Sequence, residues 1–292
     1  MRIFTRLSGL AAGFGSVLTA AAVFAQDVPL VGRPVNGAMG FQTAGTEVAR
    51  EVQWLDHFVL LIIGAITLFV TLLLLWVAFR FHEKRNKVPA KFTHNSPLEV
   101  AWTVVPIVIL VFIGAFSLPV LFKQEEIPAA DLVVKVTGNQ WYWNYEYPDE
   151  NIAFDSFLIG DGKVMNAEVE AQLIEAGYSK NEFLLATDTA LVVPVNKTVV
   201  VQLTASDVIH AWLVPALGVQ LSAVPGRLAE LWFRGEREGV YFGQCSTLCG
   251  KDHAYMPITV KVVSEAAYAE WLANAKVEYA GVPAPVTVAV AD

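Results

Sequence analysis

Two long stretches without a charged residue constrain the fold of this chain more than any other feature. They cover residues 58–79 and 100–122. Each is long enough to cross a hydrocarbon core of about 30 Å as a helix. The hydrophobic share of 55% and the mean hydropathy of +0.48 also favour membrane segments. Trp54 and Trp102 flank the stretches, where indole rings favour the headgroup layer. We therefore expect a transmembrane helix hairpin over residues 54–123.

The charges around these spans predict their orientation. The connecting loop 80–97 carries five Lys or Arg against one acid, Glu83, and short basic loops stay in the cytoplasm. Residues 1–25 have the pattern of a secretory signal peptide, with Arg2 and Arg6 before an apolar stretch that ends at Ala25. A retained membrane helix is the alternative for this stretch. Both ends of the hairpin are then external, and residues 26–53 form an irregular external arm.

Beyond Lys123 the pattern changes to short strands. Runs of β-branched and aromatic residues, separated by Gly, Pro, Asn and Asp, occupy residues 132–136, 191–195, 198–203, 228–233, 240–242 and 257–262. Residues 163–183 and 264–275 have helix-forming composition, and Ser264 is a suitable helix cap. Short strands at modest spacing indicate a β-sandwich or barrel. We expect this external domain at residues 124–280, followed by a flexible tail at 281–292.

One short segment gathers most of the metal-binding side chains. It holds the chain's two cysteines, Cys245 and Cys249, followed by His253 and Met256, and a further imidazole, His210, lies upstream. Soft sulfur and imidazole together select copper, and this set exceeds the needs of a single blue-copper centre. The surplus thiolate indicates two copper ions that share bridging sulfurs. A disulfide or a zinc site is the alternative, although structural zinc sites rarely use Met.

The spacing Cys-x3-Cys-x3-His-x2-Met with a distant His resembles the dinuclear copper A site of subunit II of haem–copper cytochrome c oxidases. The resemblance covers about residues 54–271 and implies a membrane-anchored all-β fold, with a cupredoxin-like Greek-key β-sandwich after the hairpin. It also implies the ligands. Two bridging thiolates, two imidazoles, a weak axial thioether and one backbone carbonyl are carried over to Cys245, Cys249, His210, His253, Met256 and Thr247.

The resemblance further implies a function. Such a subunit accepts electrons from cytochrome c and passes them to haem in subunit I, where oxygen is reduced and protons are pumped. This chain then has no residue at the oxygen-reducing site. Its implied partners are subunit I, subunit III, cytochrome c and membrane lipid. The implied location is a bacterial plasma membrane, with two spans and with both termini and the copper domain in the periplasm.

An aromatic run at residues 140–147 is the expected point of electron acceptance. It places five aromatic residues within seven positions. Adjacent residues of a strand face opposite ways, so one face of this run packs in the core and the other reaches the surface. The run resembles the aromatic strand of the family, which assigns electron acceptance to Trp141, with Tyr142 beside it.

The external segment is strongly acidic, with 22 Asp or Glu against 10 Lys or Arg in residues 124–292. The whole chain has a net charge of −8, which argues against nucleic acid as a partner. An acidic surface instead steers a basic protein partner. The resemblance assigns cytochrome c docking to Glu146, Asp155, Asp188 and Asp207.

Three further positions carry expectations from the family. Glu99, at the cytoplasmic start of the second span, matches a glutamate at the mouth of a proton-uptake pathway, although an interfacial carboxylate in water is the simpler interpretation. Thr247 and Ser222 stand where relatives carry Glu and Asp. A hydroxyl is a poorer ligand for magnesium than a carboxylate, so an interface magnesium is doubtful.

Two other functions fit parts of the pattern. A membrane-tethered copper carrier would use one exchangeable copper and would need neither the aromatic run nor Glu99. A structural subunit of a quinol oxidase would keep the hairpin and sandwich without copper ligands. Copper stoichiometry of two, one or none per chain separates the three possibilities.

Overall fold

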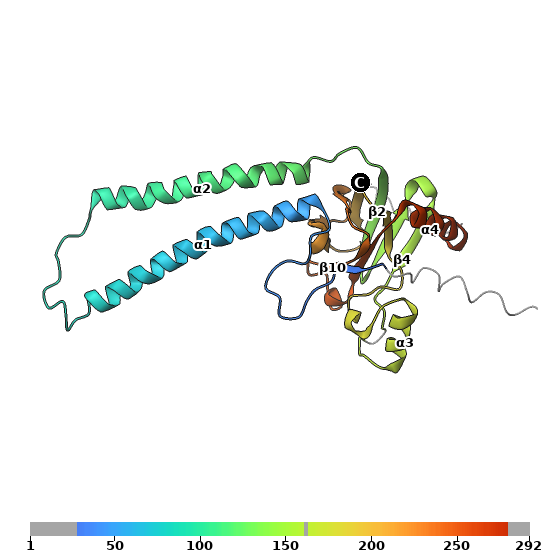
Figure 1. Ribbon diagram of the computed structural model, residues 1–292, viewed down its shortest axis with the longest axis horizontal. Coiled ribbons are helices and arrows are strands. Elements are labelled where there is room, and N and C mark those ends of the chain that lie inside the picture. Colours follow the sequence, from blue (N-terminus) through green and yellow to red (C-terminus); the bar gives the residue numbers. More distant parts are fainter. Residues whose placement is uncertain (1–27, 161–162, 280–292) are drawn as a thin grey trace, which may run out of the picture.

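The computed structural model describes residues 28–160 and 163–279 (Figure 1). Two long helices run side by side and lead into a β-sandwich, which we call the head domain (Figure 1). The expected signal peptide at 1–25 and the expected tail at 281–292 lie outside the described residues. The expected fold class, two apolar helices followed by a β-sandwich, is confirmed.

Helix α1 (Glu47–Arg80) and helix α2 (Ser96–Glu125) are both long and apolar enough to cross a membrane. Each begins at a polar cap: the Thr46 hydroxyl accepts a hydrogen bond from the backbone N–H of Ala49, and the Asn95 amide oxygen accepts one from Leu98. Their aliphatic side chains are exposed along both helices. Outside a membrane such a surface would be unfavourable, so lipid or other membrane helices must cover it.

The helices extend beyond the predicted spans. Helix α1 begins at Glu47, within the arm that the sequence predicted to be irregular, and this arm also contains strand β1 (Leu30–Gly32). The outer turn of α1 forms because it packs on the head domain: Val48 and Ala49 are buried, and Ala49 lies against Gly218. Trp54 stacks on Phe58, and both rings meet Phe116 of α2.

The head domain consists of two sheets. The first has the order β5-β11-β10-β7-β8, with β1 beside β10, and the second has the order β4-β3-β2-β6-β9. Strands β2 and β6 pair in parallel, as do β5 and β11, because the chain crosses between the sheets. The strand bounds are β2 Leu132–Asn139, β3 Tyr142–Tyr147, β4 Ile152–Ser156, β5 Leu191–Pro194, β6 Thr198–Ala205, β7 His210–Val214, β8 Val219–Ala223, β9 Ala229–Arg234, β10 Gly239–Cys245 and β11 Pro257–Val263.

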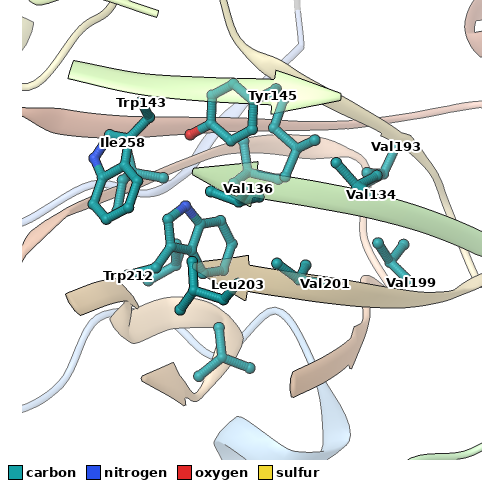
Figure 2. Packing of buried hydrophobic residues seen from close by; sticks show 14 of the residues in the cluster. Val134, Val136, Trp143, Tyr145, Val193, Val199, Val201, Leu203, Trp212 and Ile258 are labelled. Carbon is teal, nitrogen blue, oxygen red and sulfur yellow. The ribbon is translucent and has the colours of Figure 1, made fainter. Parts of the chain in front are cut away.

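The core lies between the two sheets (Figure 2). Alternate residues of β3 are buried, which places Trp143, Tyr145 and Tyr147 inside. Trp143 and Tyr145 lie near Trp212 of β7 (Figure 2), whereas the Tyr147 ring packs beside Phe154 and Trp271. A buried aromatic side chain removes about 150–250 Å² from water. At about 25 cal/mol per Å², each contributes up to about 4–6 kcal/mol before entropy costs. This core therefore fixes the strands whose ends carry the candidate site.

Short helices cover the outer surface of the sandwich, as expected from the sequence. Helix α3 (Ala167–Glu175) lies within the predicted segment 163–183. Helix α4 (Glu265–Glu278) is capped by Ser264, whose hydroxyl accepts a hydrogen bond from Ala267. A second, smaller core forms where Val169 and Leu173 of α3 meet Val240 and Phe242 of β10.

Polar contacts fasten the hairpin to the head domain. The Thr46 hydroxyl donates to the Leu217 carbonyl, 2.8 Å away, within the short helix η4 (Pro215–Leu217). The Lys123 ammonium at the end of α2 pairs with Glu47 and Glu51 of α1, each at 2.7 Å. The indole of Trp232 on β9 donates to the Lys123 carbonyl. The outer ends of both helices are thus tied to each other and to the sandwich.

Candidate metal centre

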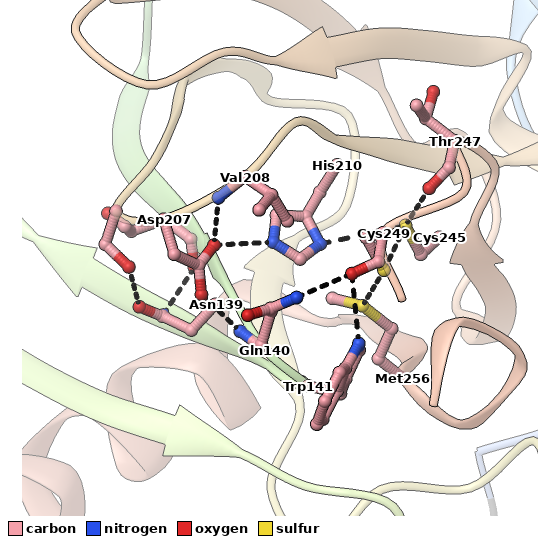
Figure 3. A network of polar contacts seen from close by, with 12 residues as sticks. Asn139, Gln140, Trp141, Asp207, Val208, His210, Cys245, Thr247, Cys249 and Met256 are labelled. Atoms are coloured by element: carbon pink, nitrogen blue, oxygen red, sulfur yellow. Dashed lines mark hydrogen bonds and ion pairs between the residues drawn. The ribbon is translucent and has the colours of Figure 1, made fainter. Parts of the chain in front are cut away.

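The candidate metal centre lies at one end of the sandwich and draws His210 from the start of β7. The His210 side chain is fully buried, and its Nε2 lies 2.9 Å from the Asp207 carboxylate (Figure 3). Its Nδ1 faces the Cys245 Sγ at 4.0 Å. The ring also packs edge-on against Trp143. The imidazole is therefore oriented with one nitrogen held by a carboxylate and the other directed to sulfur.

The remaining ligand candidates come from the end of β10 and the loop that follows it. Cys245 is the last residue of β10, and its backbone N–H donates to the Met256 carbonyl at 3.3 Å. This bond closes the loop, because Met256 directly precedes strand β11. The Trp143 indole donates to the same carbonyl. Two bonds to one oxygen thus bring Met256 back beside Cys245.

The sulfur atoms and imidazoles converge within this loop. Cys249 Sγ lies 3.9 Å from Cys245 Sγ, 3.5 Å from Met256 Sδ and 3.6 Å from His253 Nδ1. The ligand atoms of His210, Cys245 and Cys249 all lie within 4.8 Å of one another. Cys245, Cys249 and Met256 are at most 6% exposed. The structure thus brings together all five side chains that the sequence predicted as ligands.

The two cysteines are not bonded to each other. Both are free, and a sulfur separation of 3.9 Å is far longer than a disulfide bond of about 2.05 Å. The Thr247 backbone oxygen lies 3.3 Å from Cys245 Sγ, so this carbonyl also faces the cluster. Two thiols and a thioether are soft donors and two imidazoles are borderline donors, and this set suits copper; the carbonyl adds one hard donor.

The pKa values of the two thiols are shifted in opposite directions. Burial alone would raise the pKa of Cys245, but contacts with His210 and with backbone groups more than offset this effect and lower it. The pKa of Cys249 is raised, first by burial and then by the neighbouring Cys245 thiolate. Before a metal binds, the pair therefore holds one thiolate and one thiol. Metal binding to both sulfurs must release the second proton.

The predicted electron-accepting residue touches the ligand loop directly. The Trp141 indole Nε1 donates to the Cys249 carbonyl at 3.3 Å, and the Gln140 side chain donates to the same oxygen at 2.7 Å (Figure 3). Trp141 is half-buried. Tyr142 is also half-buried and stacks on Phe157. A hollow of about 430 Å³ adjoins these rings, so this part of the aromatic run reaches the surface.

Three of the four predicted docking acids lie near these rings. Partial burial and then the charges of Asp155 and Asp207 raise the pKa of Tyr142. Asp188 accepts a hydrogen bond from the backbone of Phe157. Glu146 is different: it pairs with Lys135 across the β2–β3 ladder, and its side chain is only 15% exposed. This pairing leaves Glu146 little free charge for a partner.

Three predicted positions lie outside the cluster of side-chain ligands. Glu99 is in the first turn of α2, where its carboxylate accepts a hydrogen bond from the Asn95 backbone and so helps to cap the helix. Ser222 is exposed on β8 opposite Ala211 of β7. The Thr247 side chain is half-buried, while its carbonyl faces Cys245.

Sequence reasoning missed three supporting residues. Gln140 and Trp143 each hold a carbonyl of the ligand loop. Asp207, predicted only as a docking acid, contacts His210. The Asp-x2-His spacing was a usable signal for this contact, because metal-binding histidines usually donate their second N–H to a carboxylate or carbonyl. The carbonyl contacts had no such signal, since every residue carries a carbonyl.

Comparison with known proteins gives consistent matches over both parts of the chain. The family model described as the periplasmic domain of cytochrome C oxidase subunit II matches residues 132–263, and the model of its transmembrane domain matches residues 34–120. Cytochrome c oxidase subunit 2 of Cereibacter sphaeroides is 66% identical over 283 residues, which cover 94% of this chain and 93% of that protein.

Two further proteins are similar to this chain. A probable cytochrome c oxidase subunit 2 of Rickettsia bellii is 45% identical over 242 residues, which cover 82% of this chain and 85% of that protein. The crystal structure of the periplasmic domain of cytochrome oxidase subunit II of Bradyrhizobium japonicum is 45% identical, with a TM-score of 0.45. It covers 53% of this chain and 100% of that structure.

Proposed function

The chain belongs to the cytochrome c oxidase subunit II family, and from that premise we propose that its buried sulfur and imidazole cluster holds a dinuclear copper A centre. Members of this family are the electron-transfer subunits of a haem–copper oxidase, whose catalytic site lies in subunit I. The convergence of two free, buried cysteines on His210, His253 and Met256 carries the proposal. The chain is a two-span membrane protein.

Each member of the cluster has a defined part in the proposal. Cys245 and Cys249 would supply the bridging thiolates, His210 and His253 one nitrogen each, Met256 a weak thioether ligand, and Thr247 its carbonyl. The copper bound there would supply one-electron transfer. The protein contributes burial, which excludes water, and strand pairing, which holds the ligands in one arrangement.

His210 binds through Nδ1 in this proposal, because that nitrogen faces Cys245 while Nε2 faces Asp207. A carboxylate acceptor fixes the proton on Nε2 and leaves Nδ1 free as a ligand. Asp207 is therefore a positioning residue for His210. The Asp207 carboxylate also accepts hydrogen bonds from the backbone N–H groups of Gln140 and Val208, which hold it in place beside His210.

Electrons enter through Trp141 in this proposal. Its indole combines partial exposure with a hydrogen bond to the carbonyl of the bridging residue Cys249, so a donor that contacts the ring is connected to the cluster by one hydrogen bond. Replacing Trp141 by Phe keeps an aromatic ring but removes that bond. We expect the purified oxidase to accept electrons from reduced cytochrome c more slowly, while the copper spectrum is unchanged.

Cytochrome c docks, in our proposal, on the acidic surface around Tyr142. Asp155, Asp188 and Asp207 are exposed there, and Tyr142 and Phe157 supply an apolar centre. Glu146 contributes least of the four predicted acids because Lys135 neutralises it. Charge at such a surface acts mainly on the association rate. Neutralising Asp155 and Asp188 together is therefore expected to slow association at low salt and to have little effect at high salt.

Three further assignments complete the proposal. Glu99 forms the start of a proton-uptake pathway, a role compatible with its place in the first turn of α2. Subunit III and membrane lipid join subunit I as partners of the exposed apolar helices. The membrane is a bacterial plasma membrane, with the copper domain and both termini in the periplasm. Glu99→Gln is expected to slow proton uptake in the assembled oxidase without changing the copper spectrum.

An interface magnesium is absent or weak in this proposal. Thr247 and Ser222 offer hydroxyls at the two positions where the family uses carboxylates, and a hard cation prefers carboxylates. The double variant Thr247→Glu, Ser222→Asp is expected to acquire a manganese signal in electron paramagnetic resonance when the oxidase is prepared with manganese. A stoichiometric manganese signal in the unaltered, chelator-washed complex contradicts this assignment.

A copper count with electron paramagnetic resonance on the purified full chain tests the main proposal. Two coppers sharing one delocalised unpaired electron are expected. One copper per chain instead supports a membrane-tethered copper carrier. A chain that binds none under conditions that load a control copper protein supports a structural subunit of a quinol oxidase.

A further inference from the structure

A groove that plays no part in the metal centre crosses the outer surface of the head domain. It has a volume of about 860 Å³ and lies between helices α3 and α4, over strands β5 and β11. Val192, Lys261 and Val263 from the two strands line it, together with the aromatic rings of Tyr178 and Trp271. Ligand pockets commonly have volumes of about 300–1,000 Å³, so the groove is large enough for a specific partner.

The rim of the groove is acidic. Five exposed carboxylates line it: Glu175, Asp188, Glu238, Glu270 and Glu278. Many other acids of the head domain pair with a Lys, Arg or His, for example Glu236 and Glu146. None of the five forms an ion pair within residues 28–160 and 163–279. They form a concentration of negative charge around a concave, partly apolar surface.

One cation lies within this acidic rim. Lys261 projects from β11 on the face opposite the core residues Val260 and Val262, and its ammonium lies 5.5 Å from the centre of the Tyr178 ring. Within the described chain its ammonium has neither a salt bridge nor a hydrogen-bonded acceptor. Burial lowers the pKa of Lys261. The groove thus combines a donor that lacks an acceptor with carboxylates that lack a cation.

The Lys261 ammonium without an acceptor and the five carboxylates without a cation together restrict which kind of molecule can bind in the groove. A polyamine would satisfy the carboxylates but would bring Lys261 no acceptor. A small anion would satisfy Lys261 but would be repelled by five negative charges. A peptide segment meets both needs, since its Lys or Arg side chains pair with the rim, its carbonyls accept from Lys261, and its apolar side chains pack on Trp271 and Phe154. We propose that this groove binds a basic, partly apolar peptide segment of a partner protein.

The chain's own C-terminal residues do not have this chemistry. Residues 280–292 follow directly on Tyr279, which lines the groove, but they contain no Lys or Arg and do contain an Asp. Charge complementarity therefore favours another polypeptide. Of the acids assigned to the proposed cytochrome c surface, only Asp188 also lines the groove; Glu146, Asp155 and Asp207 do not.

Binding of a defined probe to the full chain in detergent tests the proposal. The probe is a fluorescent nine-residue peptide in which Lys alternates with Ala and Leu, followed by fluorescence anisotropy. The triple variant E175Q/E270Q/E278Q is expected to weaken binding about tenfold, from three partly exposed ion pairs. Lys261→Met removes a donor to the peptide carbonyls and also a positive charge that repels both cationic ligands. It is therefore expected to lower the ratio of peptide affinity to spermidine affinity several-fold.

Matched controls separate this groove from general acidity. The variant D149N/E168Q/E230Q removes the same number of charges from exposed positions that do not line the groove, and it is expected to bind the peptide as the unaltered chain does. Thermal melting of each variant checks the fold. A chain ending at Tyr279 is expected to bind the peptide with unchanged affinity.

Several results would overturn the proposal. They are no binding of the Lys peptide by the unaltered chain, equal weakening by both triple variants, or an unchanged ratio of peptide affinity to spermidine affinity in Lys261→Met. Much tighter binding by the chain ending at Tyr279 would also overturn it, because the groove would then be occupied by residues 280–292. None of these outcomes bears on the copper count, so the proposed electron-transfer function stands or falls separately.

Discussion

The two sides of the metal centre are built in different ways. On the strand side, His210 is fully buried at the start of β7, and its ring is held by Asp207 and Trp143. On the loop side, His253 is partly exposed and Cys249 is held through its carbonyl by Gln140 and Trp141. Side-chain contacts thus fix the strand side, whereas bonds to backbone oxygens fix the loop side. The two sides are therefore expected to respond to different substitutions.

Removing either sulfur has the largest expected effect. Cys245→Ser acts on the strand side and Cys249→Ser on the loop side, and each leaves one thiolate where two bridges are needed. We expect both variants to lose the delocalised two-copper signal, measured by electron paramagnetic resonance with a copper count. If Cys249→Ser retained that signal, the loop side would not supply a bridge, and the comparison would fail.

Asp207→Asn perturbs the strand side without removing a ligand, because Asp207 contacts His210 and not the metal. The amide can still accept one hydrogen bond but does not favour the proton on His210 Nε2 as a carboxylate does. Outer contacts of this kind typically change metal affinity about 10–100-fold, and we expect a loss of that size in a chelator competition. Asp155→Asn removes the same charge from an exposed acid near Tyr142 and is expected to leave copper affinity unchanged.

Gly138 lies beside His210 on the strand side and Gly250 lies beside Trp141 on the loop side, so the same substitution can be made on both sides of the metal centre. A Cβ on Gly138 would lie 2.9 Å from a His210 ring carbon, and one on Gly250 would lie 2.9 Å from the Trp141 ring. Gly250 also has a φ of +130°, which costs other residues about 1–3 kcal/mol. We expect Gly138→Ala to lower copper affinity and Gly250→Ala to slow electron acceptance more than it lowers affinity. Chelator competition measures copper affinity, and rapid mixing with reduced cytochrome c measures the rate of electron acceptance. If both variants changed affinity and rate to the same extent, the two sides would not differ in this way.

The smallest expected effect is spectroscopic. In the metal-free chain the pKa of Cys245 is lowered to about 6 and that of Cys249 is raised to about 12. Between these values the pair carries one thiolate, which ultraviolet absorbance near 240 nm detects. Because the folded pKa of Cys245 is depressed, its contribution to stability is present above the unfolded value and is lost as the pH falls through about 6. Cys245→Ser is expected to abolish that thiolate absorbance, and Cys249→Ser to keep it.

Much of the fold could be predicted because its signals are local. The hairpin follows from uncharged length, and the six predicted strands correspond to β2, β5, β6, β9, β10 and β11, with the predicted ranges at β5 and β9 each extending one residue beyond the strand. Strands β1, β4, β7 and β8 were not predicted, since segments of three to five residues such as Val219–Ala223 are specified by pairing with their neighbours and not by their own composition. The outer turn of α1 was missed for the same reason, because its burial against Gly218 is a long-range contact.

The ligand residues were predictable because few side chains bind soft metals and the spacing is specific. The residues that hold them were not. Trp143 was expected only as core, and its bond to the Met256 carbonyl depends on the register of β3 against a loop more than a hundred positions away. Glu99 and the docking acids remain predictions, because they depend on partners that meet this chain only in the complex.

The contacts of Lys123 and Thr46 couple the orientation of the membrane helices to that of the head domain. Helix α1 has 34 residues, about 51 Å at 1.5 Å per residue, whereas a hydrocarbon core is about 30 Å thick. The excess length continues as helix beyond the bilayer, and its cap residue Thr46 is hydrogen-bonded to Leu217, which lies between strands β7 and β8. A tilt of α1 in the lipid therefore also tilts strands β7 and β8, the first of which begins at His210. The membrane helices thus set the position of the metal centre above the bilayer.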